Sequence, residues 1–579
     1  MTVRPTQTGL VLILLAVIGV PLGLYFVLHT SNQTQYVPAF PSITIAGVVV
    51  PHDALVAGPR ADFFSTLAAS MVAPTTIILL SPNHYYAGYG HIQTTDQVWH
   101  LDGGQIQPDA TLIDSLLADG SVTREPSSFI NEHGIYSVLG DIRKNFPKAL
   151  IVPLIFQNTT MAELRAVEQR LNKSCTSCLV IASVDFSHYQ PALLGQLHDE
   201  RSIRDLDTLN TDDILTGAEV DSGPALALLT LWARDHDANR FVLKNHTNSG
   251  VITGNPDIES TTHVFGWYTS GVQTVPTSGV SFIIGGDVMF ARMIAHTFGN
   301  DFNAAFADLG DRVFWGTDAA IVNEEGAITT QPIRDDISSA NFTFLFSPRS
   351  ASTLSYLHIN AVSQANNHSA NGGLQGVETT RSVLNAAGIQ TFGGPSGGDV
   401  SRVAVFHGSG LSLTVIGVNM LSPGQTAEAL VPLITEAKQD PTMRVLVMPH
   451  WGVEYSPGHT SAQAAAAHVW VDAGADIIIG SHPHVIEDSE LYRGVPIIYS
   501  LGNLLFDQAF STATQEGLLI AGSFTPDGLT LFGLPAQSVK YQPRLMTGSA
   551  KTQILDALYF PFKNFLQVTP AGTVVRMVR

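Results

Sequence analysis

Cysteine is almost absent from this sequence of 579 residues, which contains only Cys175 and Cys178, in a C-T-S-C segment. A zinc site made of four thiolates needs a second pair of cysteines, so that class of site is excluded. The pair is not preceded by a βαβ start of the thioredoxin kind. A local disulfide or two free thiols is therefore expected, rather than a redox motif.

Basic residues are also scarce, because 29 Lys and Arg stand against 49 Asp and Glu and give a net charge of −20. This balance argues against a nucleic-acid partner. Only 13% of the residues are charged while 45% are hydrophobic, which is typical of a well-buried globular protein. The length predicts about three to four structural units.

One long hydrophobic run is present, at residues 9–28, and it contains no charged residue. Its length of about 20 residues is what a helix needs to cross a bilayer. Arg4 precedes the run and the next basic residue is Arg60, so residues 1–8 are expected to stay in the cytoplasm. A cleaved signal peptide is the alternative, but no convincing A-x-A site follows. The sequence thus predicts a single-pass protein of the cell membrane with extracytoplasmic domains, joined to its anchor by a tether at residues 29–42.

Beyond the tether, short β-branched runs alternate with amphipathic segments, which predicts an α/β fold with mostly parallel sheets covered by helices. The segment 271–280 is uncharged and rich in small residues, as linkers are. A second α/β series starts at Ser281. The predicted domains are therefore residues 43–270 and 281–545, followed by a C-terminal extension at 546–579.

Side chains of the kinds that bind metals follow five apolar strands of the second half. Open α/β sheets place their ligands at the carboxyl ends of strands. Hard divalent metals take carboxylate and amide oxygens together with imidazoles, and two such metals about 4 Å apart hydrolyse phosphate esters. The residues at these strand ends are Asp287; Asn323, Glu324 and Glu325; Asn366, Asn367 and His368; His450; and His482 with His484.

The segments GGDVMFAR, VNEE, ANNHSANGG, HWGVEY, AGADIIIGSHPH and YSLGNLLFD carry these residues. Together they resemble the CapA, or poly-γ-glutamate capsule biosynthesis, family, which belongs to the calcineurin-like metallophosphoesterases. The resemblance covers about residues 281–545. It implies an α/β sandwich with a metal site at the strand ends, holding two divalent ions (Mn, Fe or Zn).

The resemblance also implies roles for single residues. Asp287 and His484 would bind the first metal, and Glu325 would bridge the two. Strand alternation lets only one of Glu324 and Glu325 face the site, and the N-x-E register favours Glu325. For the remaining positions the resemblance implies Asn367, His450 and His482 on the second metal, His368 as the acid beside the metals, and Arg292 as a ligand for an anionic substrate.

Two departures from the family pattern stand out. The wider superfamily begins this motif with D-x-H, whereas Met289 stands at the histidine position, so one imidazole ligand is missing. Asn371 occupies a position that often carries Asp, which weakens a contact outside the metal ligands. Glu454 is expected at the rim of the site, and Trp451 and Tyr455 are expected in packing or in a substrate-stacking wall.

The first half also gathers imidazoles and carboxylates at predicted strand ends. The segments VVPHDALVAG, LLSPNHYY, NEHGIYSVLGDI and ASVDFSHY resemble the MEMO family (AmmeMemoRadiSam system protein B), whose fold is like that of extradiol dioxygenase subunits. The resemblance covers roughly residues 43–270. In that family two histidines and a cysteine can bind a metal.

His52 and His84 match the histidines of that family, and Asp221 falls near the cysteine position. A carboxylate there gives the two-His-one-carboxylate set of non-haem iron, so one metal ion is expected in this half. A purely structural or substrate-binding domain is the alternative. The other residues implied in the cleft are Glu132, His133, Asp185 and His188, with His188 as a base.

Two functions follow from these patterns. The first is a metal-dependent hydrolase or transferase of capsule or surface polyanion biosynthesis, acting on a poly-γ-glutamate-type polymer or a phosphoester, beside a polyglutamate synthase complex. The second is a non-catalytic anchor of such a complex, with vestigial metal sites. Met289 favours the scaffold and the otherwise full ligand set favours the enzyme. A weaker third hypothesis puts redox chemistry on the MEMO-like half.

Overall fold

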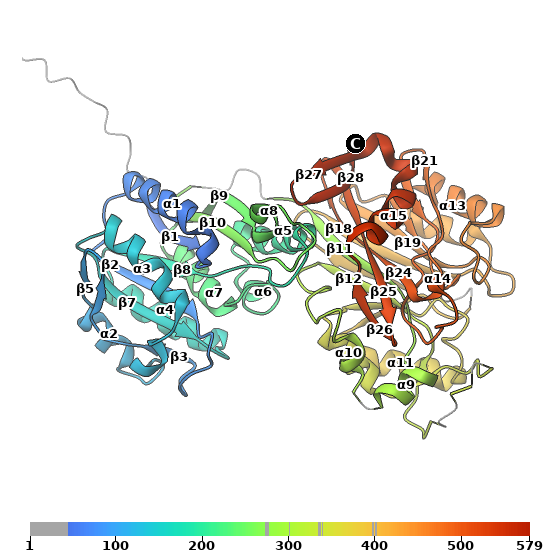
Figure 1. Ribbon diagram of the computed structural model, residues 1–579, viewed down its shortest axis with the longest axis horizontal. Coiled ribbons are helices and arrows are strands. Elements are labelled where there is room, and N and C mark those ends of the chain that lie inside the picture. The colour runs from blue at the N-terminus through green and yellow to red at the C-terminus, as the bar shows by residue number, and fades with distance from the viewer. Residues whose placement is uncertain are drawn as a thin grey trace, which may run out of the picture. The chain divides into compact units, whose positions relative to one another are not determined.

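The computed structural model shows a mixed α/β protein (Figure 1). The structure describes residues 44–271, 277–299, 301–333, 337–338, 340–396, 399 and 402–578.

The predicted membrane anchor is not supported by this structure. Within the described ranges, no helix combines the length and the apolar character needed to cross a membrane. The predicted span, residues 9–28, lies outside the described residues. The prediction rested on hydropathy and on the positions of basic residues, which describe composition and not structure. The prediction of a single-pass cell-membrane protein with extracytoplasmic domains is therefore wrong for the chain as described.

The first half is built on a sheet with the strand order β6-β3-β7-β2-β8-β1-β10-β9. The central strands β7, β2, β8 and β1 are parallel, whereas β10 and β9 continue the sheet in antiparallel pairing. The strands of this half are β1 (Ile45–Val50), β2 (Thr76–Pro82), β3 (Ile92–Thr94), β6 (Thr123–Arg124), β7 (Leu150–Phe156), β8 (Cys178–Ser183), β9 (Arg240–Asn248) and β10 (Thr262–Thr269), with a separate hairpin of β4 (Trp99–Leu101) and β5 (Gly104–Ile106).

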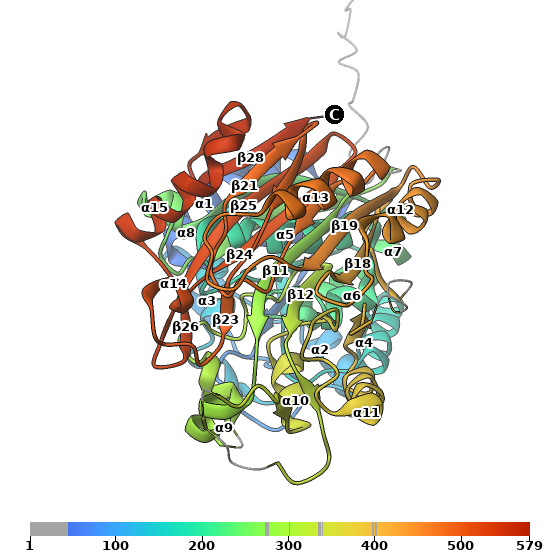
Figure 2. The ribbon, with the colours of Figure 1, turned by 90° about the vertical axis from the view of Figure 1, so that its right-hand side faces the viewer.

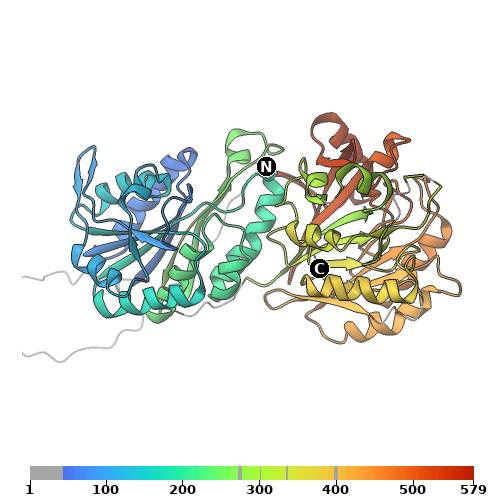
Figure 3. The same cartoon turned by 90° about the horizontal axis from the view of Figure 1, so that it is seen from below.

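Helices cover both faces of this sheet, as Figure 3 shows for the blue and cyan part of the chain. Because side chains alternate along a strand, Val48 and Val50 enter the core on one face and Val49 enters the core on the other. This burial on both faces explains the continuous apolar runs of the sequence. The helices are α1 (Ala57–Ser70), α2 (Ala110–Leu117), α3 (His133–Asn145), α4 (Met161–Ser174), α5 (Ala192–Thr208), α6 (Thr211–Thr216), α7 (Gly223–Asp235) and α8 (Ser249–Thr253).

Cys175 and Cys178 form a disulfide between the end of α4 and the start of β8, with Cα atoms 5.9 Å apart. Of the two states that the sequence left open, the structure has the local disulfide.

The second half is a sandwich of two sheets. In the first sheet, β11, β12, β15 and β16 are parallel neighbours, and β11 and β12 run side by side in Figure 2. Its strands are β11 (Val280–Val288), β12 (Ala319–Glu324), β15 (Ala361–Ser363), β16 (Gln390–Phe392), β23 (Asn503–Leu505), β24 (Glu516–Thr525), β25 (Gly528–Val539), β26 (Gln542–Leu545), β27 (Leu566–Thr569) and β28 (Gly572–Val578).

The second sheet has the order β17-β18-β19-β20-β22-β21, and β18, β19, β20 and β22 are parallel. Phe282 and Ile284 of β11 share one buried core with Leu446 of β19 and Ile477 of β20, so the two sheets pack face to face. The strands are β17 (Val403–His407), β18 (Ser412–Asn419), β19 (Met443–His450), β20 (Ile477–Ile479), β21 (Ser489–Tyr492) and β22 (Val495–Ile498), and a small parallel pair is formed by β13 (Ala327–Ile328) and β14 (Leu345–Phe346).

Helices cover the outer faces of the sandwich. Leu354 and Leu384 pack with Ile283 outside the first sheet, and Trp470 packs with Val447 outside the second. The helices are α9 (Arg292–Phe298), α10 (Arg349–Tyr356), α11 (Gly373–Ala386), α12 (Val431–Ala437), α13 (Ser461–Ala473), α14 (Thr512–Gln515) and α15 (Gly548–Tyr559).

The C-terminal strands complete the first sheet. β24 pairs antiparallel with β11 and β25 pairs antiparallel with β24, so residues from 516 onward continue the sheet that carries the first strand of this half.

Candidate metal centre

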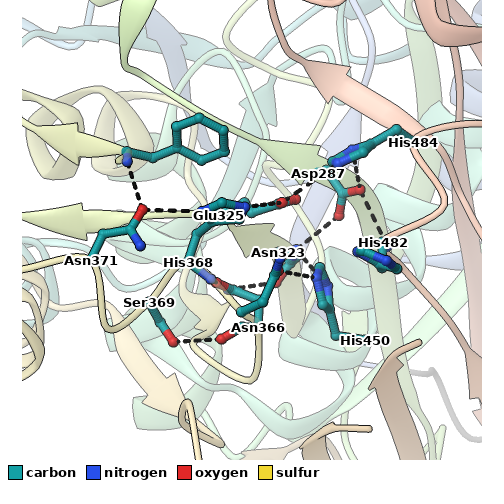
Figure 4. A network of polar contacts seen from close by, with 12 residues as sticks. Asp287, Asn323, Glu325, Asn366, His368, Ser369, Asn371, His450, His482 and His484 are labelled. Carbon is teal, nitrogen blue, oxygen red and sulfur yellow. Dashed lines mark hydrogen bonds and ion pairs between the residues drawn. The ribbon is translucent and has the colours of Figure 1, made fainter. Parts of the chain in front are cut away.

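The polar strand ends of the second half meet at one place (Figure 4). They come from both sheets, since β11 and β12 belong to the first and β19 and β20 to the second. Parallel strands end at the same edge of a sheet, which is why residues far apart in the sequence converge there. The residues in contact are Asp287, Asn323, Glu325, Asn366, Asn367, His368, His450, His482 and His484.

Asp287, at the end of β11, is fully buried at the centre of the cluster. Its Oδ1 accepts a hydrogen bond from Asn323 Nδ2 at 2.8 Å, and its Oδ2 lies 3.3 Å from His484 Nδ1. The preceding residue has to be glycine, because a Cβ on Gly286 would lie 2.0 Å from the carbonyl oxygen of Gly502. The close approach of β11 and β23 therefore fixes where this carboxylate points.

The two neighbouring glutamates at the end of β12 have different surroundings. Glu324 accepts a hydrogen bond from Gln364 Nε2 at 2.8 Å. Both carboxylate oxygens of Glu325 are buried and have no hydrogen-bond partner, and one lies 3.6 Å from His484 Nε2 and 3.8 Å from His368 Nε2. Burial raises the pKa of each carboxyl to about 8. The structure therefore places Glu325 among the imidazoles, on the side that the N-x-E register favours.

His450 and His482 are neutral imidazoles in contact with each other, with ring centroids 4.7 Å apart. Burial lowers the pKa of His482 to about 4 and that of His450 well below its usual value. His450 Nε2 lies 2.9 Å from Asn367 Oδ1, whereas His482 Nδ1 is buried without a partner. The neutral ring is the form that binds a metal, and an orphaned ring nitrogen is a free ligand.

The His-Pro-His loop after β20 has a strained backbone, and both of its rings point into the cluster. His482 has φ 100° and His484 has φ 57°, a region that residues other than glycine rarely occupy. The backbone N–H of Tyr455 donates to the carbonyl of Pro483 at 2.8 Å. His484 Nδ1 lies 3.0 Å from Asn503 Oδ1. Burial lowers the pKa of His484, but Glu325 and Asp287 outweigh burial and raise it to about 9.

His368 lies beside the cluster and is held by two contacts. Its Nδ1 lies 3.1 Å from Asn371 Oδ1, and its ring stacks on Phe344 with centroids 4.1 Å apart. Burial lowers its pKa. Asn371 Oδ1 also accepts the backbone N–H of Phe344 at 2.6 Å, so the amide at this position links the His368 ring to the backbone of Phe344.

Arg292, at the start of α9, is turned toward Asp507, with which it forms an ion pair. Its guanidinium also lies 4.7 Å from the centre of the Phe344 ring. It lines a cavity of about 670 Å³ together with Asn341 and Thr343. Since a carboxylate already balances its charge, Arg292 offers an anionic substrate less attraction than the sequence implied.

Met289 does not occupy the place of a ligand. Its side chain is fully buried in an apolar core, and its sulfur accepts the backbone N–H of Ala291 at 2.8 Å. The imidazole that the superfamily pattern would supply here is therefore missing from the centre.

Some side chains reach the centre although the sequence did not predict them as metal ligands, and Glu454 was expected only at its rim. Glu454 offers a carboxylate oxygen that lies with nitrogens of His482 and His484 in a group whose atoms are all within 4.8 Å of one another. Asp287, Glu325 and His450 form a second such group. Asn323 and Asn503 orient ligands through hydrogen bonds. The signal of these asparagines in the sequence is weak, because asparagines at strand ends are common in turns.

A second cluster lies at strand ends of the first half. His52 Nε2 is 3.2 Å from Asp221 Oδ2 and 3.3 Å from Asp185 Oδ2, and His84 Nε2 is 3.7 Å from the same oxygen of Asp221. Burial lowers the pKa values of both histidines, but carboxylates outweigh it: Asp185 and Asp221 raise the pKa of His52, and Asp221 and Glu132 raise that of His84 to about 9. Asp221, which the resemblance puts near the cysteine position, thus contacts both rings.

The remaining predicted residues of this half surround that cluster. Glu132 caps α3 by accepting the N–H of Gly134 at 3.0 Å, and it also contacts His84 through the backbone N–H at 2.9 Å and through Nδ1 at 2.5 Å. His133 stacks on His84 with centroids 3.9 Å apart, and burial and His84 lower its pKa. His188 has a buried Nδ1 without a partner, and its backbone N–H donates to Glu219 Oε1 at 3.3 Å.

Comparison with known families agrees with both resemblances. Residues 281–508 match the family described as bacterial capsule synthesis protein PGA_cap, and residues 25–258 match the Memo-like protein family. The second match begins inside the run that was predicted to span a membrane. The two resemblances expected from the sequence are thus confirmed.

Curated relatives match each half separately. "PGA biosynthesis protein CapA" of Bacillus subtilis is 28% identical over 50% of this chain and 80% of its own length. "Capsule biosynthesis protein CapA" of Bacillus anthracis is 30% identical over 32% of this chain and 49% of its own. A MEMO1 family protein of Caldivirga maquilingensis is 24% identical over 40% of this chain and 84% of its own length.

Among solved structures, a purple acid phosphatase from yellow lupin seeds is similar with a TM-score of 0.25 and 11% identity, covering 53% of this chain and 66% of its own.

Proposed function

This chain joins a Memo-like domain to a CapA-like capsule biosynthesis domain, and we propose that the CapA-like domain is a metal-dependent hydrolase or transferase that acts on a capsule or surface polyanion. The proposed substrate is a poly-γ-glutamate-type polymer or a phosphoester. Two divalent ions, Mn, Fe or Zn, are the proposed cofactors.

One observation carries this proposal: Glu325 is a fully buried carboxylate that accepts no hydrogen bond at either oxygen and has the imidazoles of His368 and His484 beside it. Burying a charge is costly unless it is paired or binds a metal. His482 adds a buried ring nitrogen that also lacks a partner. Asp287, Glu325 and His450 offer ligand atoms within 4.8 Å of one another, which fits a divalent cation.

The proposed ligand sets follow these contacts. Asp287 and His484 would bind one ion, Asn367, His450 and His482 the other, and Glu325 would bridge them. When bound, two such ions supply Lewis acidity and a nucleophile at neutral pH. Asn323, Asn503 and Ser481 would hold Asp287, His484 and His450 in place through hydrogen bonds.

His368 is proposed to pass a proton to the leaving group. Its Nε2 faces Glu325 at 3.8 Å, while Nδ1 is held by Asn371, so the ring presents one nitrogen to the centre. Arg292, with its charge balanced by Asp507, is proposed to position substrate through the cavity it lines rather than to attract an anion.

The proposed context is a polymer-synthesis complex. The relatives of the C-terminal half carry the names PGA biosynthesis protein and capsule biosynthesis protein, which supports a polyglutamate-type polymer as substrate and a polyglutamate synthase as partner. The alternative is a non-catalytic component of such a complex that binds the polymer with vestigial metal sites. The loss of an imidazole at Met289 supports that alternative.

Metal analysis and activity of the full chain decide between the two. If the domain is an enzyme, the CapA-like centre should bind two equivalents of metal per chain and hydrolyse bis-p-nitrophenyl phosphate. His482→Ala should lower both the metal content and the rate of hydrolysis. The control His407→Ala removes an exposed imidazole on β17 and should change neither. A chain that binds polyglutamate but neither metal nor phosphodiester would establish the scaffold instead.

A second proposal concerns the Memo-like half, where Asp221 favours a site for one metal ion with His52 and His84. Its Oδ2 lies within 3.7 Å of the Nε2 atoms of both histidines, as a two-His-one-carboxylate set requires. Asp221→Ala should lose iron binding to this half, whereas Asp102→Ala, in an exposed turn, should retain it. Equal iron content in the two variants would show that Asp221 is not a ligand, and a wild-type chain without iron in this half would favour a structural domain.

A further inference from the structure

The CapA-like centre lacks one imidazole, and the side chain of Glu454 lies beside two of the imidazoles that are present. In a D-x-H motif the histidine binds the same metal as the aspartate. Here Met289 is buried in the core and its sulfur accepts a backbone N–H, so it supplies nothing to the centre. An incomplete set of ligands leaves a metal weakly bound unless another residue replaces the missing one.

Glu454 reaches the centre from the loop after β19. A carboxylate oxygen of Glu454, a nitrogen of His482 and a nitrogen of His484 all lie within 4.8 Å of one another. The two rings are buried, whereas Glu454 is exposed to solvent. The carboxylate therefore approaches the ligands from the solvent side.

The loop that carries Glu454 is held in a fixed conformation. Gly452 has φ 90°, and a Cβ there would lie 2.7 Å from Gln463 Nε2. Tyr455 has φ 64°, and its N–H donates to the carbonyl of Pro483, between the two histidines. The HWGVEY loop and the His-Pro-His loop are thus joined by a backbone hydrogen bond at the residue next to Glu454.

Two further observations point to a cation at this place. His482 is 5% exposed, and its Nδ1 is buried without a hydrogen-bond partner. Glu325 is also fully buried, and neither of its oxygens accepts a hydrogen bond. In native proteins, buried polar and charged side chains have a hydrogen-bond partner or bind an ion.

The charges of the centre favour a third carboxylate among the ligands. Two divalent ions bring four positive charges, and Asp287 with Glu325 supplies only two negative ones. Arg292 does not change this difference, because Asp507 balances its charge. Glu454 would bring the balance closer to neutrality, which stabilises two cations held close together.

We propose that Glu454 is a metal ligand of the CapA-like centre and takes the coordination position that Met289 leaves open. The inference rests on the proposed two-metal centre and adds a residue to it. Replacing an imidazole by a carboxylate adds an oxygen ligand, and oxygen ligands suit Mn²⁺ better than Zn²⁺. The centre therefore prefers manganese at the position that Glu454 completes.

The test is Mn²⁺ binding to the full chain, measured by titration calorimetry and by metal analysis after gel filtration. Glu454→Gln should lower the affinity of one of two Mn²⁺ ions by about 10- to 100-fold and should lose that ion on the column. Glu454→Asp keeps a carboxylate and should lose less affinity. Glu428→Gln, which changes an exposed glutamate next to α12, is the matched control and should bind both ions.

Folding is checked without metal, where Glu454→Gln and the wild type should unfold at the same temperature because Glu454 is exposed. Two ions bound by Glu454→Gln with unchanged affinity would overturn the inference and leave the proposed function standing. A wild-type chain that binds no Mn²⁺, Fe²⁺ or Zn²⁺ in this centre would overturn both.

Discussion

At the scale of single residues, the orientation of the proposed metal ligands depends on neighbouring side chains that are not ligands themselves. Asn503 is the clearest case. Its Oδ1 lies 3.0 Å from His484 Nδ1, and its Nδ2 donates to the carbonyls of His484 and Thr514 at 3.2 and 3.0 Å. One amide thus fixes both the ring and the backbone of a strained residue.

Asn503→Ala should therefore weaken metal binding without touching a metal. We expect a fall in affinity of about 10- to 100-fold, because a ring that is free to rotate loses its orientation toward the metal. Titration of the full chain with Mn²⁺ measures this. Gln425→Ala, which replaces an amide on a distant loop, should leave the affinity as it is. Equal affinities in the two variants would show that the His-Pro-His loop alone orients His484.

The residues that meet at the strand ends were singled out at this scale, whereas their roles as metal ligands stay predictions. The residue types at the strand ends and the preference for Glu325 over Glu324 follow from strand alternation, which is a local property of the sequence. The ion pair of Arg292 with Asp507 could not be predicted in this way. It joins two segments from different parts of the chain, and a charged residue near a motif does not reveal which partner balances it.

At the scale of elements, helix α4 shows how local signals set a boundary. Thr160 and Glu163 form a capping box, in which the Thr160 side chain accepts the N–H of Glu163 and the Glu163 side chain accepts that of Thr160. Thr160→Ala should lower the free energy of unfolding by about 1 kcal/mol. Urea denaturation, followed through the transition in which the first half unfolds, measures this.

The matched control is Thr66→Ala in helix α1. Thr66 is exposed, and its hydroxyl donates to the carbonyl of Asp62 within the same helix. We expect a change within about 0.5 kcal/mol, as for other surface positions. A loss at Thr66 as large as that at Thr160 would mean that threonine side chains, rather than the cap, stabilise these helices.

Helix α4 also contains a buried glutamate, because of which we expect the stability of the protein to depend on pH. Burial, together with the nearby Asp235, raises the pKa of Glu168 from 4.5 to about 7. A carboxyl whose pKa is raised on folding stabilises the folded state below its unfolded pKa, and this contribution is lost as the pH rises through about 7. Glu168→Gln should therefore gain stability relative to the wild type as the pH rises from about 5 to about 8.

Thermal unfolding at both pH values checks this, with Glu259→Gln as an exposed control. The side-chain amide of Asn172 donates to the carboxylate of Glu168, and it can donate equally to the amide oxygen that Glu168→Gln introduces, so the substitution retains this hydrogen bond. A constant difference in stability between Glu168→Gln and the wild type over this range would contradict the raised pKa.

The existence of the strands was predicted from the sequence, whereas the order of the strands within each sheet was not. The apolar runs after residue 43 form strands buried on both faces, as their composition indicates. The antiparallel pairing of β24 with β11 was not predicted, because a run of apolar residues carries no information about the strand it will pair with. The hydrophobic run at residues 9–28 was likewise predicted to be a membrane anchor, but no helix of the described residues is long and apolar enough to cross a membrane.

At the scale of the whole molecule, the net charge of −20 opposes the approach of a polyanion. Raising the ionic strength screens this repulsion. The rate constant for association of labelled poly-γ-glutamate with the Mn²⁺-loaded chain should therefore rise between about 10 and about 150 mM NaCl at constant metal occupancy. Stopped-flow fluorescence measures this rate. A rate constant that falls steeply with salt would instead indicate a basic surface that attracts the polymer.

The sequence by itself determined the kinds of ligand, the strands that carry them and the two families, because residue type, strand periodicity and ordered motifs are all local properties of the chain. Only the tertiary structure decided which of these residues meet. It brought Asp221 between His52 and His84, turned Arg292 toward Asp507 and set Glu454 beside His482 and His484. The physical reason is that such contacts depend on the order of strands and on the conformation of loops, and both are fixed by packing across the whole fold.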